Sequence, residues 1–86
     1  MIGVASIDSD VNEIESWIIR TWKTMFERED IGTDSEFFSL GGDSVSALSF
    51  IFYLEQERGV EADAAIVYEN PTVAQMTKHL QALQSA

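Results

Sequence analysis

Apolar residues recur at helical spacing between residues 11 and 26, while charged residues lie mostly off that stripe. The stripe consists of Val11, Ile14, Ile18, Trp22 and Met25, widened by Ile19 and Phe26. Asp10, followed by Glu13 three residues later, forms an aspartate version of the capping box found at helix starts. The pattern predicts a first helix that begins at Asp10, preceded by a loose leader over residues 1–9, which show no sustained period.

Residues 44–58 predict a second helix with apolar side chains on two sides. Asp43 or Ser44 is placed as its N-cap, and Gly59 stands where helices commonly stop. The face with core spacing consists of Ala47, Phe50, Ile51 and Leu54. A second set, called the outer stripe here, begins beside Ser44 and consists of Val45, Leu48 and Phe52. A small bundle need not cover both faces.

The last part of the chain predicts one short helix and one longer one. The segment EADAAIVYEN gives a weakly determined turn of helix around residues 64–68, which Pro71 closes. Asn70-Pro71-Thr72 then opens the last helix, with Pro71 suited to its first turn. The inward stripe of that helix is Val73, Met76, Leu80 and Leu83.

Residues 27–43 carry charge, glycines and turn formers without helical period, and therefore predict a long loop. The loop is expected to be ordered because four large apolar side chains can hold it against the core: Ile31, Phe37, Phe38 and Leu40. No strand-like alternation and no repeat is found. The predicted fold is all-α, a small four-helix bundle of three main helices and a short third one, with the long loop between helices 1 and 2.

Composition narrows the range of functions. The 86 residues suffice for one small domain, and the absence of cysteine excludes disulfides, thiolate metal sites and a cysteine nucleophile. A net charge of -10 disfavours nucleic acid and anionic lipid and favours basic protein partners, although acidity can also serve solubility alone. Neither a membrane span nor a signal peptide is recognisable. We expect a cytoplasmic monomer without nucleic-acid or membrane partners.

Three catalytic or ligand-binding interpretations fit the sequence poorly. A hydrolase elbow at residues 42–46 lacks its final glycine and a preceding strand, and the only histidine, His79, lies in the last helix as a partly exposed residue. Gly41-Gly42 has no lysine after it, so a phosphate-binding loop is excluded. Asp30, Asp34 and Glu36 lack the ligand spacing of a calcium loop.

The tetrapeptide Gly41-Gly42-Asp43-Ser44 allows two interpretations. It can be a flexible turn followed by a helix cap. Alternatively, two glycines clear the approach to Ser44, and the outer stripe beginning at the next residue guides an enzyme that modifies the hydroxyl. An isolated serine needs such a partner to activate it. A phosphate attached there would lie at the positive end of a helix dipole, a setting worth about 0.3–1 kcal/mol.

The segment Phe37-Phe38-Ser39-Leu40-Gly41-Gly42-Asp43-Ser44 resembles the modification motif of phosphopantetheine-bearing carrier domains, especially the peptidyl carrier (thiolation) domains of nonribosomal peptide synthetases. Gly59-Val60 and the segment from Asn70 to Val73 are weaker similarities in the expected order. The resemblance implies a non-catalytic carrier domain over residues 10–84. It further implies 4'-phosphopantetheine attached to Ser44, flanked by Gly42 and Asp43, and an acyl, aminoacyl or peptidyl thioester on the arm.

The resemblance also implies partners and alternatives. The partners would be a phosphopantetheinyl transferase, an adenylation or other loading enzyme, and a condensation or tailoring enzyme of antibiotic or other specialised biosynthesis. They would contact the outer stripe, with Asp43 and Glu55 as charged edges. Arg58, the pair Asp63-Ala64 and Ser35 depart from the family's usual residues. The alternatives are an acyl carrier of a polyketide pathway and, in another class, an unmodified acidic adaptor.

Overall fold

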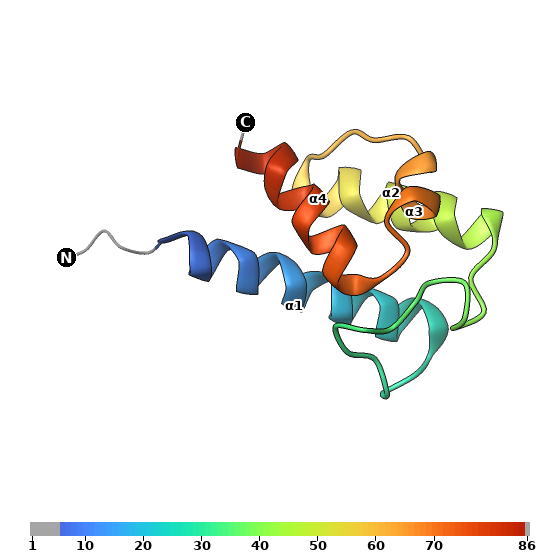
Figure 1. Ribbon diagram of the computed structural model, residues 1–86. Coiled ribbons are helices and arrows are strands. Elements are labelled where there is room, and N and C mark those ends of the chain that lie inside the picture. Colours follow the sequence, from blue (N-terminus) through green and yellow to red (C-terminus); the bar gives the residue numbers. More distant parts are fainter. Residues whose placement is uncertain (1–5, 86) are drawn as a thin grey trace.

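The computed structural model describes residues 6–85 and is built from four α-helices (Figure 1). Their bounds are Ser6–Phe26 for α1, Ser44–Arg58 for α2, Ala65–Glu69 for α3 and Val73–Ser85 for α4. Within residues 6–85 the only extended pairing is an isolated bridge between Glu36 and Thr72. The all-α prediction, including the short third helix and the long first connection, is confirmed.

Helix α1 begins at Ser6, four residues before the predicted start. Asp10 is therefore inside the helix, and its prediction as N-cap is wrong; residues 6–9 of the predicted leader belong to α1. The remaining leader, residues 1–5, lies outside the described residues, as does the side chain of Val11. In Figure 1 the amino-terminal turns of α1 extend beyond the other helices. The helix begins before the first residue of the apolar stripe, which is why the stripe alone placed the start too late.

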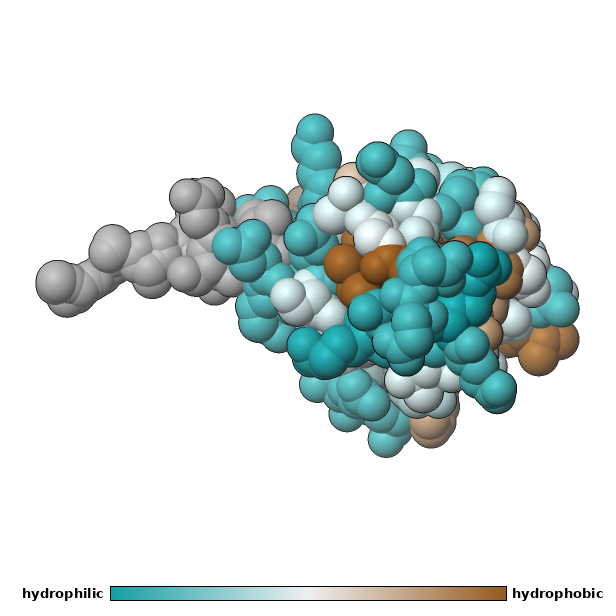
Figure 2. All heavy atoms as spheres, turned by 90° about the horizontal axis from the view of Figure 1, so that it is seen from below, coloured by the Kyte–Doolittle hydropathy of each residue, from teal (hydrophilic) through white to brown (hydrophobic). Residues whose placement is uncertain are grey.

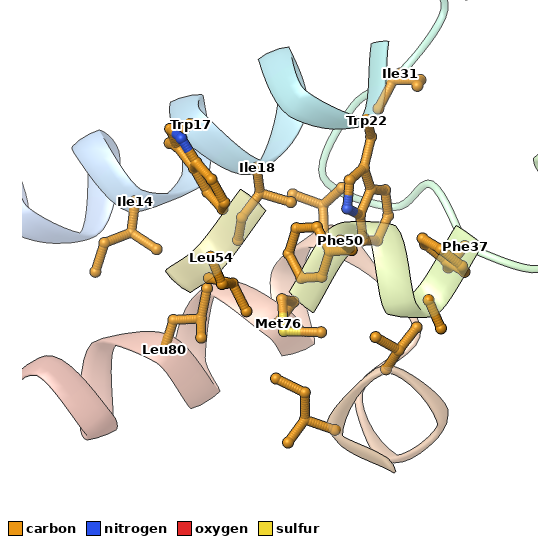
Figure 3. Close-up of a cluster of buried hydrophobic side chains, with 14 residues drawn as sticks. Ile14, Trp17, Ile18, Trp22, Ile31, Phe37, Phe50, Leu54, Met76 and Leu80 are labelled. Atoms are coloured by element: carbon orange, nitrogen blue, oxygen red, sulfur yellow. The ribbon is translucent and has the colours of Figure 1, made fainter. Parts of the chain in front are cut away.

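The core lies between α1, α2 and α4 and includes the long loop (Figure 3). Figure 3 shows side chains of α1, α2 and α4 directed toward one another. Three of the four core positions predicted on α2 are fully buried, namely Ala47, Phe50 and Leu54, and the fourth, Ile51, is half-buried. Trp17 is also buried, at 5 % exposure, although it lies off the stripe identified in the sequence. The apolar face of α1 is therefore wider than its spacing indicated.

Leu83 is not part of the core, so the prediction of an inward position is wrong. Its side chain is 45 % exposed, whereas Val73, Met76 and Leu80 are fully buried. Helix α2 ends at Arg58, and the last turn of α4 therefore faces the chain reversal at Gly59 instead of a helix. Leu83 lines an open recess of about 410 Å³ there, together with Arg58 and Val60.

The start of α4 is capped by a pair of residues that the sequence analysis did not recognise. The Thr72 hydroxyl accepts a hydrogen bond from the Gln75 amide at 3.1 Å, and the Thr72 amide donates to the Gln75 side chain at 3.2 Å. This is a capping box with a glutamine as its fourth residue. Pro71 therefore precedes the N-cap and does not occupy the first turn. Its carbonyl instead accepts a 2.7 Å hydrogen bond from the Phe37 amide.

The long loop over residues 27–43 is ordered, as predicted. Ile31 and Phe37 are buried in the core. The backbone is also hydrogen-bonded to the start of α4, because Val73 donates to Ser35 at 3.1 Å and Ala74 donates to Thr33 at 3.0 Å. Ser35, one of the departures from the family pattern, accepts a hydrogen bond from the Gly32 amide at 2.9 Å through its hydroxyl. The loop therefore forms a fixed platform before α2.

The carboxyl end of α2 is held by polar contacts. Arg58, whose side chain is 11 % exposed, donates two 2.7 Å hydrogen bonds to the Glu13 carboxylate and lies 5.4 Å from the ring centroid of Trp17. It also donates to Gln84 on α4 at 3.2 Å. The Trp17 indole donates to Glu57 at 2.8 Å. One arginine thus connects α1, α2 and α4, and Gly59 ends α2 in the left-handed conformation with φ 66.

Candidate modification site

The turn before α2 is shaped by two glycines with different physical requirements. Gly41 has φ 106, a conformation that L-residues with side chains rarely adopt. A Cβ on Gly42 would lie 2.4 Å from two ring carbons of Phe37 and 2.7 Å from its carbonyl oxygen. Both glycines are therefore needed to build the turn. The sequence predicted that the glycines clear an approach to Ser44, whereas the structure gives each glycine its own conformational or steric reason.

Phe37 anchors this turn in the core. Its ring is fully buried and makes edge-to-face contacts with Trp22 and Phe26 of α1, at centroid distances of 5.2 and 5.1 Å. Its carbonyl accepts the Gly42 amide hydrogen bond at 3.1 Å. Because Phe37 is fixed by α1, the glycines and the residues after them are held in a fixed position relative to the bundle.

Asp43 is the N-cap of α2, which decides between the two candidates left open by the sequence. Its carboxylate accepts hydrogen bonds from the Ser46 amide at 2.9 Å and the Ser46 hydroxyl at 3.0 Å. These bonds, first of all the one from the amide, hold the pKa of the Asp43 carboxyl below its ordinary value. Ser44 is consequently the first helical residue and is left free of capping.

The Ser44 side chain is exposed at the amino end of α2. Among the hydrogen bonds of the described residues none involves the Ser44 hydroxyl, whereas the Ser46 hydroxyl is engaged with Asp43. A phosphate ester on Ser44 would meet the positive end of the helix dipole and no buried surface. Because the Ser46 amide already donates its hydrogen bond to Asp43, the helix dipole would be the main local interaction that stabilises this phosphate. The residues present therefore fit a phosphodiester on this serine.

The outer stripe is exposed along the helix that begins with Ser44. Val45, Leu48 and Phe52 are 70, 61 and 58 % exposed, so the bundle does not cover this face. Glu55, predicted as a charged edge, is also exposed. Tyr68 of α3 is a further exposed aromatic residue that the sequence analysis missed; it stacks on Phe38 at 4.8 Å. Large exposed apolar residues grouped in this way are typical of interaction surfaces.

The other chemistries considered from the sequence receive no support. His79 is a half-buried residue of α4, as predicted. Among the side chains that the structure describes, those of residues 12–84, no group of three histidine or carboxylate side chains is arranged to hold a metal ion. Over the same residues, no helix has the length and apolar character required to cross a membrane. The face seen in Figure 2 is largely hydrophilic, with hydrophobic residues near its centre and at the end away from the amino terminus.

A recessed groove between α1 and α2 was also missed by the sequence analysis. Half of the residues that line it carry hydroxyl groups, among them Thr21 and Thr24 of α1 and Ser49 and Tyr53 of α2. Residues of this type carry no hydropathy signal, so neither spacing nor composition indicated that they face one another.

Comparison with known proteins finds relatives over most of this chain. The family model "Phosphopantetheine attachment site" matches residues 16–80. The chain is 32 % identical over 69 residues to surfactin synthase subunit 3 of Bacillus subtilis (strain 168) and 31 % identical over 77 residues to pyochelin synthetase PchE of Pseudomonas aeruginosa (strain UCBPP-PA14). These matches cover 80 and 90 % of this chain but only 5 % of each synthetase.

A solved structure agrees with this assignment. BlmI, a type-II acyl-carrier-protein from Streptomyces verticillus involved in bleomycin biosynthesis, superposes with a TM-score of 0.83 at 27 % identity, covering 90 % of this chain and 93 % of BlmI. The matched segment contains the glycine turn, the start of α2 and its outer stripe. The chain therefore belongs to the phosphopantetheine attachment family, the non-catalytic carrier domains that bear 4'-phosphopantetheine on a serine and interact with the enzymes of a synthetase.

Proposed function

We propose that Ser44 is the serine that carries 4'-phosphopantetheine, and that Gly42 and Asp43 hold it in position. The observation that carries this proposal is the exposed Ser44 hydroxyl, free of hydrogen bonds among the described residues, at a helix start fixed by Phe37 and Asp43. The neighbouring Ser46 is a poorer candidate because its hydroxyl is bonded to Asp43 at 3.0 Å.

The modification requires a phosphopantetheinyl transferase, magnesium and coenzyme A. In that reaction the Ser44 oxygen forms a bond to the β-phosphorus of coenzyme A, and the pyrophosphate bond breaks. The hydroxyl proton is lost to a base of the transferase, and adenosine 3',5'-bisphosphate leaves. The arm supplies the thiol that this cysteine-free chain lacks. The chain's own contribution is to expose the hydroxyl and to hold the backbone around it.

We further propose that the arm carries an aminoacyl or peptidyl thioester within nonribosomal peptide biosynthesis. The similarity to surfactin and pyochelin synthetases supports this cargo over the acyl group of a polyketide pathway. The motif Leu40-Gly41-Gly42-Asp43-Ser44 supports the same choice. The domain predicted over residues 10–84 would begin earlier, with α1 at Ser6. Its cytoplasmic location and monomeric state stay predictions from the sequence.

The partner enzymes would dock on the outer stripe. Val45, Leu48 and Phe52 provide exposed apolar surface beside the modified residue, and Asp43 and Glu55 can pair with basic residues at its edges. A loading enzyme of the adenylation type and a condensation or tailoring enzyme would then reach the same thiol in turn. The net charge of -10 favours basic surfaces on those partners.

The attachment site is tested by intact mass after incubation with a broad-specificity phosphopantetheinyl transferase, magnesium and coenzyme A. We expect the native chain and Ser46→Ala to gain one phosphopantetheine, and Ser44→Ala to gain none. Ser46→Ala is the matched control, since it removes a serine hydroxyl two residues away on the same helix. If a folded native chain gains nothing while another carrier is modified in parallel, the unmodified adaptor replaces this proposal.

The docking surface is tested by the rate of modification by the same transferase. Leu48→Ala and Phe52→Ala remove exposed apolar surface near Ser44 and should lower the second-order rate constant severalfold. Leu83→Ala should leave the rate constant unchanged. Leu83 belongs to α4, is 45 % exposed and lies near the carboxyl end of α2, away from Ser44. An equal rate in all three variants would contradict the role of the outer stripe.

A further inference from the structure

The polar groove between α1 and α2 consists of two recesses of about 250 Å³ each, which share Thr24 and Tyr53 in their walls. The nearer recess lies toward the amino end of α2 and is also lined by Val45 and Ser49. The farther recess lies toward the carboxyl end of α2 and is also lined by Glu57. Together the two recesses form one groove along α2.

The groove lies on a different side of α2 from Ser44. A helix turns by about 100° per residue, so Ser49 and Tyr53 lie about 140° and 180° around the axis from Ser44. The lining of the groove meets the outer stripe only at Val45. A ligand in the groove would therefore leave the Ser44 side chain accessible.

Thr21 supplies the groove with a polar group that the protein itself does not use. It lines the farther recess and is only 8 % exposed. Its hydroxyl makes no hydrogen bond with another described residue, whereas the hydroxyl of the other buried threonine, Thr77, donates to the Val73 carbonyl at 2.8 Å. Among the described side chains Trp22 Nε1 is the only fully enclosed polar atom without a partner, so the Thr21 oxygen borders the open recess. Because buried hydroxyls are normally hydrogen-bonded, this one is suited to a polar group that enters the groove.

We propose that the groove binds a short extended peptide segment of another protein, and that this segment carries a lysine or an arginine. The site goes beyond the proposed carrier function and does not depend on the attachment at Ser44. A protein bound in the groove would stay beside the carrier while other enzymes act on the Ser44 side, which raises its effective concentration.

The walls of the groove fit an extended backbone. Each residue of an extended segment has an amide donor and a carbonyl acceptor to satisfy, whereas a helix satisfies most of these groups internally. A hydroxyl both donates and accepts, and hydroxyls lie on both walls of the groove: Thr21 and Thr24 on α1, and Ser49 and Tyr53 on α2. A partner helix would instead require a hydrophobic groove for its apolar face. The lining therefore favours an extended segment over a helix.

The length of the groove sets the length of the segment. Its lining on α2 runs from Val45 to Glu57, which is about 18 Å at the usual rise of roughly 1.5 Å per helical residue. An extended chain advances about 3.3 Å per residue, so roughly five or six residues cover this distance.

The charges favour a basic side chain in the segment. Glu57 is exposed on the wall of the farther recess, and one of its oxygens accepts the Trp17 indole hydrogen bond at 2.8 Å. Its other oxygen has no donor among the described contacts, so a lysine or arginine of the segment can pair with it. Arg20 carries the only positive charge of the lining, but the whole chain has a net charge of -10. The long-range field therefore attracts a cationic segment, and Glu57 provides the contact for its charge.

The test is a selection of random heptapeptides displayed on phage against the Ser44→Ala chain, immobilised through its amino terminus. This variant has no attachment serine, so the result is independent of the outcome at Ser44. Phage that also bind the double variant Ser44→Ala/Ser49→Tyr are removed first, because the tyrosine fills the nearer recess and such phage bind elsewhere. We expect the remaining phage to be enriched in peptides that contain lysine or arginine.

The binding site of the enriched peptides is located by NMR. Synthetic peptides are titrated into the isotope-labelled chain, and we expect shifts at the Trp17 indole N–H and at the amides of Thr21, Thr24 and Tyr53. The amides of α3 should not shift.

Matched variants assign the contacts, with circular dichroism to establish that each is folded. Thr21→Val replaces the buried hydroxyl with a methyl group of similar size and should weaken binding about fivefold, the usual net value of one hydrogen bond. Glu57→Gln still offers an acceptor to the Trp17 indole but should remove the preference for a lysine peptide over its norleucine analogue. Lys78→Tyr, on the exposed face of α4, should leave the affinity unchanged. No enrichment after the removal step, shifts confined to the outer stripe or α3, or full affinity in Thr21→Val would each overturn the proposal.

Discussion

The two ends of α2 are fixed by opposite means. At the amino end, Gly42 packs directly against the buried Phe37 ring, which itself packs against α1, so the anchor is apolar. At the carboxyl end, Arg58 pairs with Glu13, covers Trp17 and contacts Gln84, so the anchor is polar and close to water. The same helix therefore depends on packing at one end and on charge at the other.

This difference suits the proposed function. The attachment serine must be exposed, yet its backbone has to stay in place while several enzymes approach it in turn. An apolar anchor beneath the turn meets both needs, because the Phe37 ring holds the backbone from inside and leaves the outer side of Ser44 free. The carboxyl end has no such requirement, and a half-exposed ion pair suffices there.

Replacing Phe37 is the strongest way to break the amino-end anchor. Phe37→Ala should lower the free energy of unfolding by about 3–5 kcal/mol, because it empties a fully buried site in the aromatic cluster. Phe52→Ala, at 58 % exposure, should change it by less than about 0.5 kcal/mol. Urea denaturation followed by circular dichroism measures both. If Phe37→Ala leaves too little folded protein, Phe37→Leu should still cost about 1–2 kcal/mol.

The glycines of the turn separate steric from conformational constraints. Gly42→Ala should destabilise by about 1–3 kcal/mol or more, because its Cβ would overlap the Phe37 ring. Gly41→Ala should cost about 1–2 kcal/mol through strain at φ 106, with open space around the new methyl group. Gly32→Ala serves as the control, since that position has no heavy atom within 4 Å of a Cβ and no positive φ. Equal denaturation midpoints for all three variants would exclude the proposed mechanism.

These two glycines show what the sequence could and could not indicate. The pattern located the turn, narrowed the N-cap of α2 to Asp43 or Ser44 and identified the outer stripe, because each depends on residues close together in the chain. It assigned the glycines to access, since the contact between Gly42 and Phe37 depends on how the turn folds back on itself. It placed Asp10 as a cap for a similar reason. Local capping signals recur inside helices, and only the tertiary structure shows which of them are used.

Arg58 was the departure from the family pattern whose role could not be read from the sequence. Its partners Glu13, Trp17 and Gln84 are 45, 41 and 26 residues away along the chain. Helical periodicity locates the faces of helices but does not say which charged residues meet between them. The same limit explains why the α1–α2 groove was not foreseen.

Arg58→Met removes the polar anchor at the carboxyl end of α2 while keeping most of the aliphatic stem. The loss of the Glu13 pair and of the contact with Trp17 should cost about 1–2 kcal/mol at low salt. A double-mutant cycle with Glu13→Gln should give a coupling energy below about 1 kcal/mol.

Salt then distinguishes the two ends of α2. The Arg58–Glu13 coupling should shrink in 1 M NaCl, where the Debye length is about 3 Å, because Glu13 is largely exposed. The loss caused by Phe37→Leu should not shrink. A coupling energy that stays the same in high salt would show that the pair depends on its two hydrogen bonds and not on charge that salt can screen.

The smallest expected effect concerns the charge of Asp43, whose carboxylate caps the amino end of α2. Hydrogen bonds from Ser46 lower the pKa of Asp43 below its ordinary value of 3.8, so its carboxylate contributes stability that is fully present above that value. The contribution is lost as pH falls through the lowered folded pKa, when the carboxylate is protonated.

Asp43→Asn keeps a capping oxygen but removes the titration. Its denaturation midpoint should therefore lie slightly below that of the native chain at pH 7, and the difference should narrow in acid. Glu13, whose pKa is lowered chiefly by its hydrogen bond to Arg58, titrates alike in both proteins and cancels in this comparison. A gap that widens in acid would mean that the carboxylate does not stabilise the start of α2, leaving Phe37 and the glycines as the sole anchors of the attachment site.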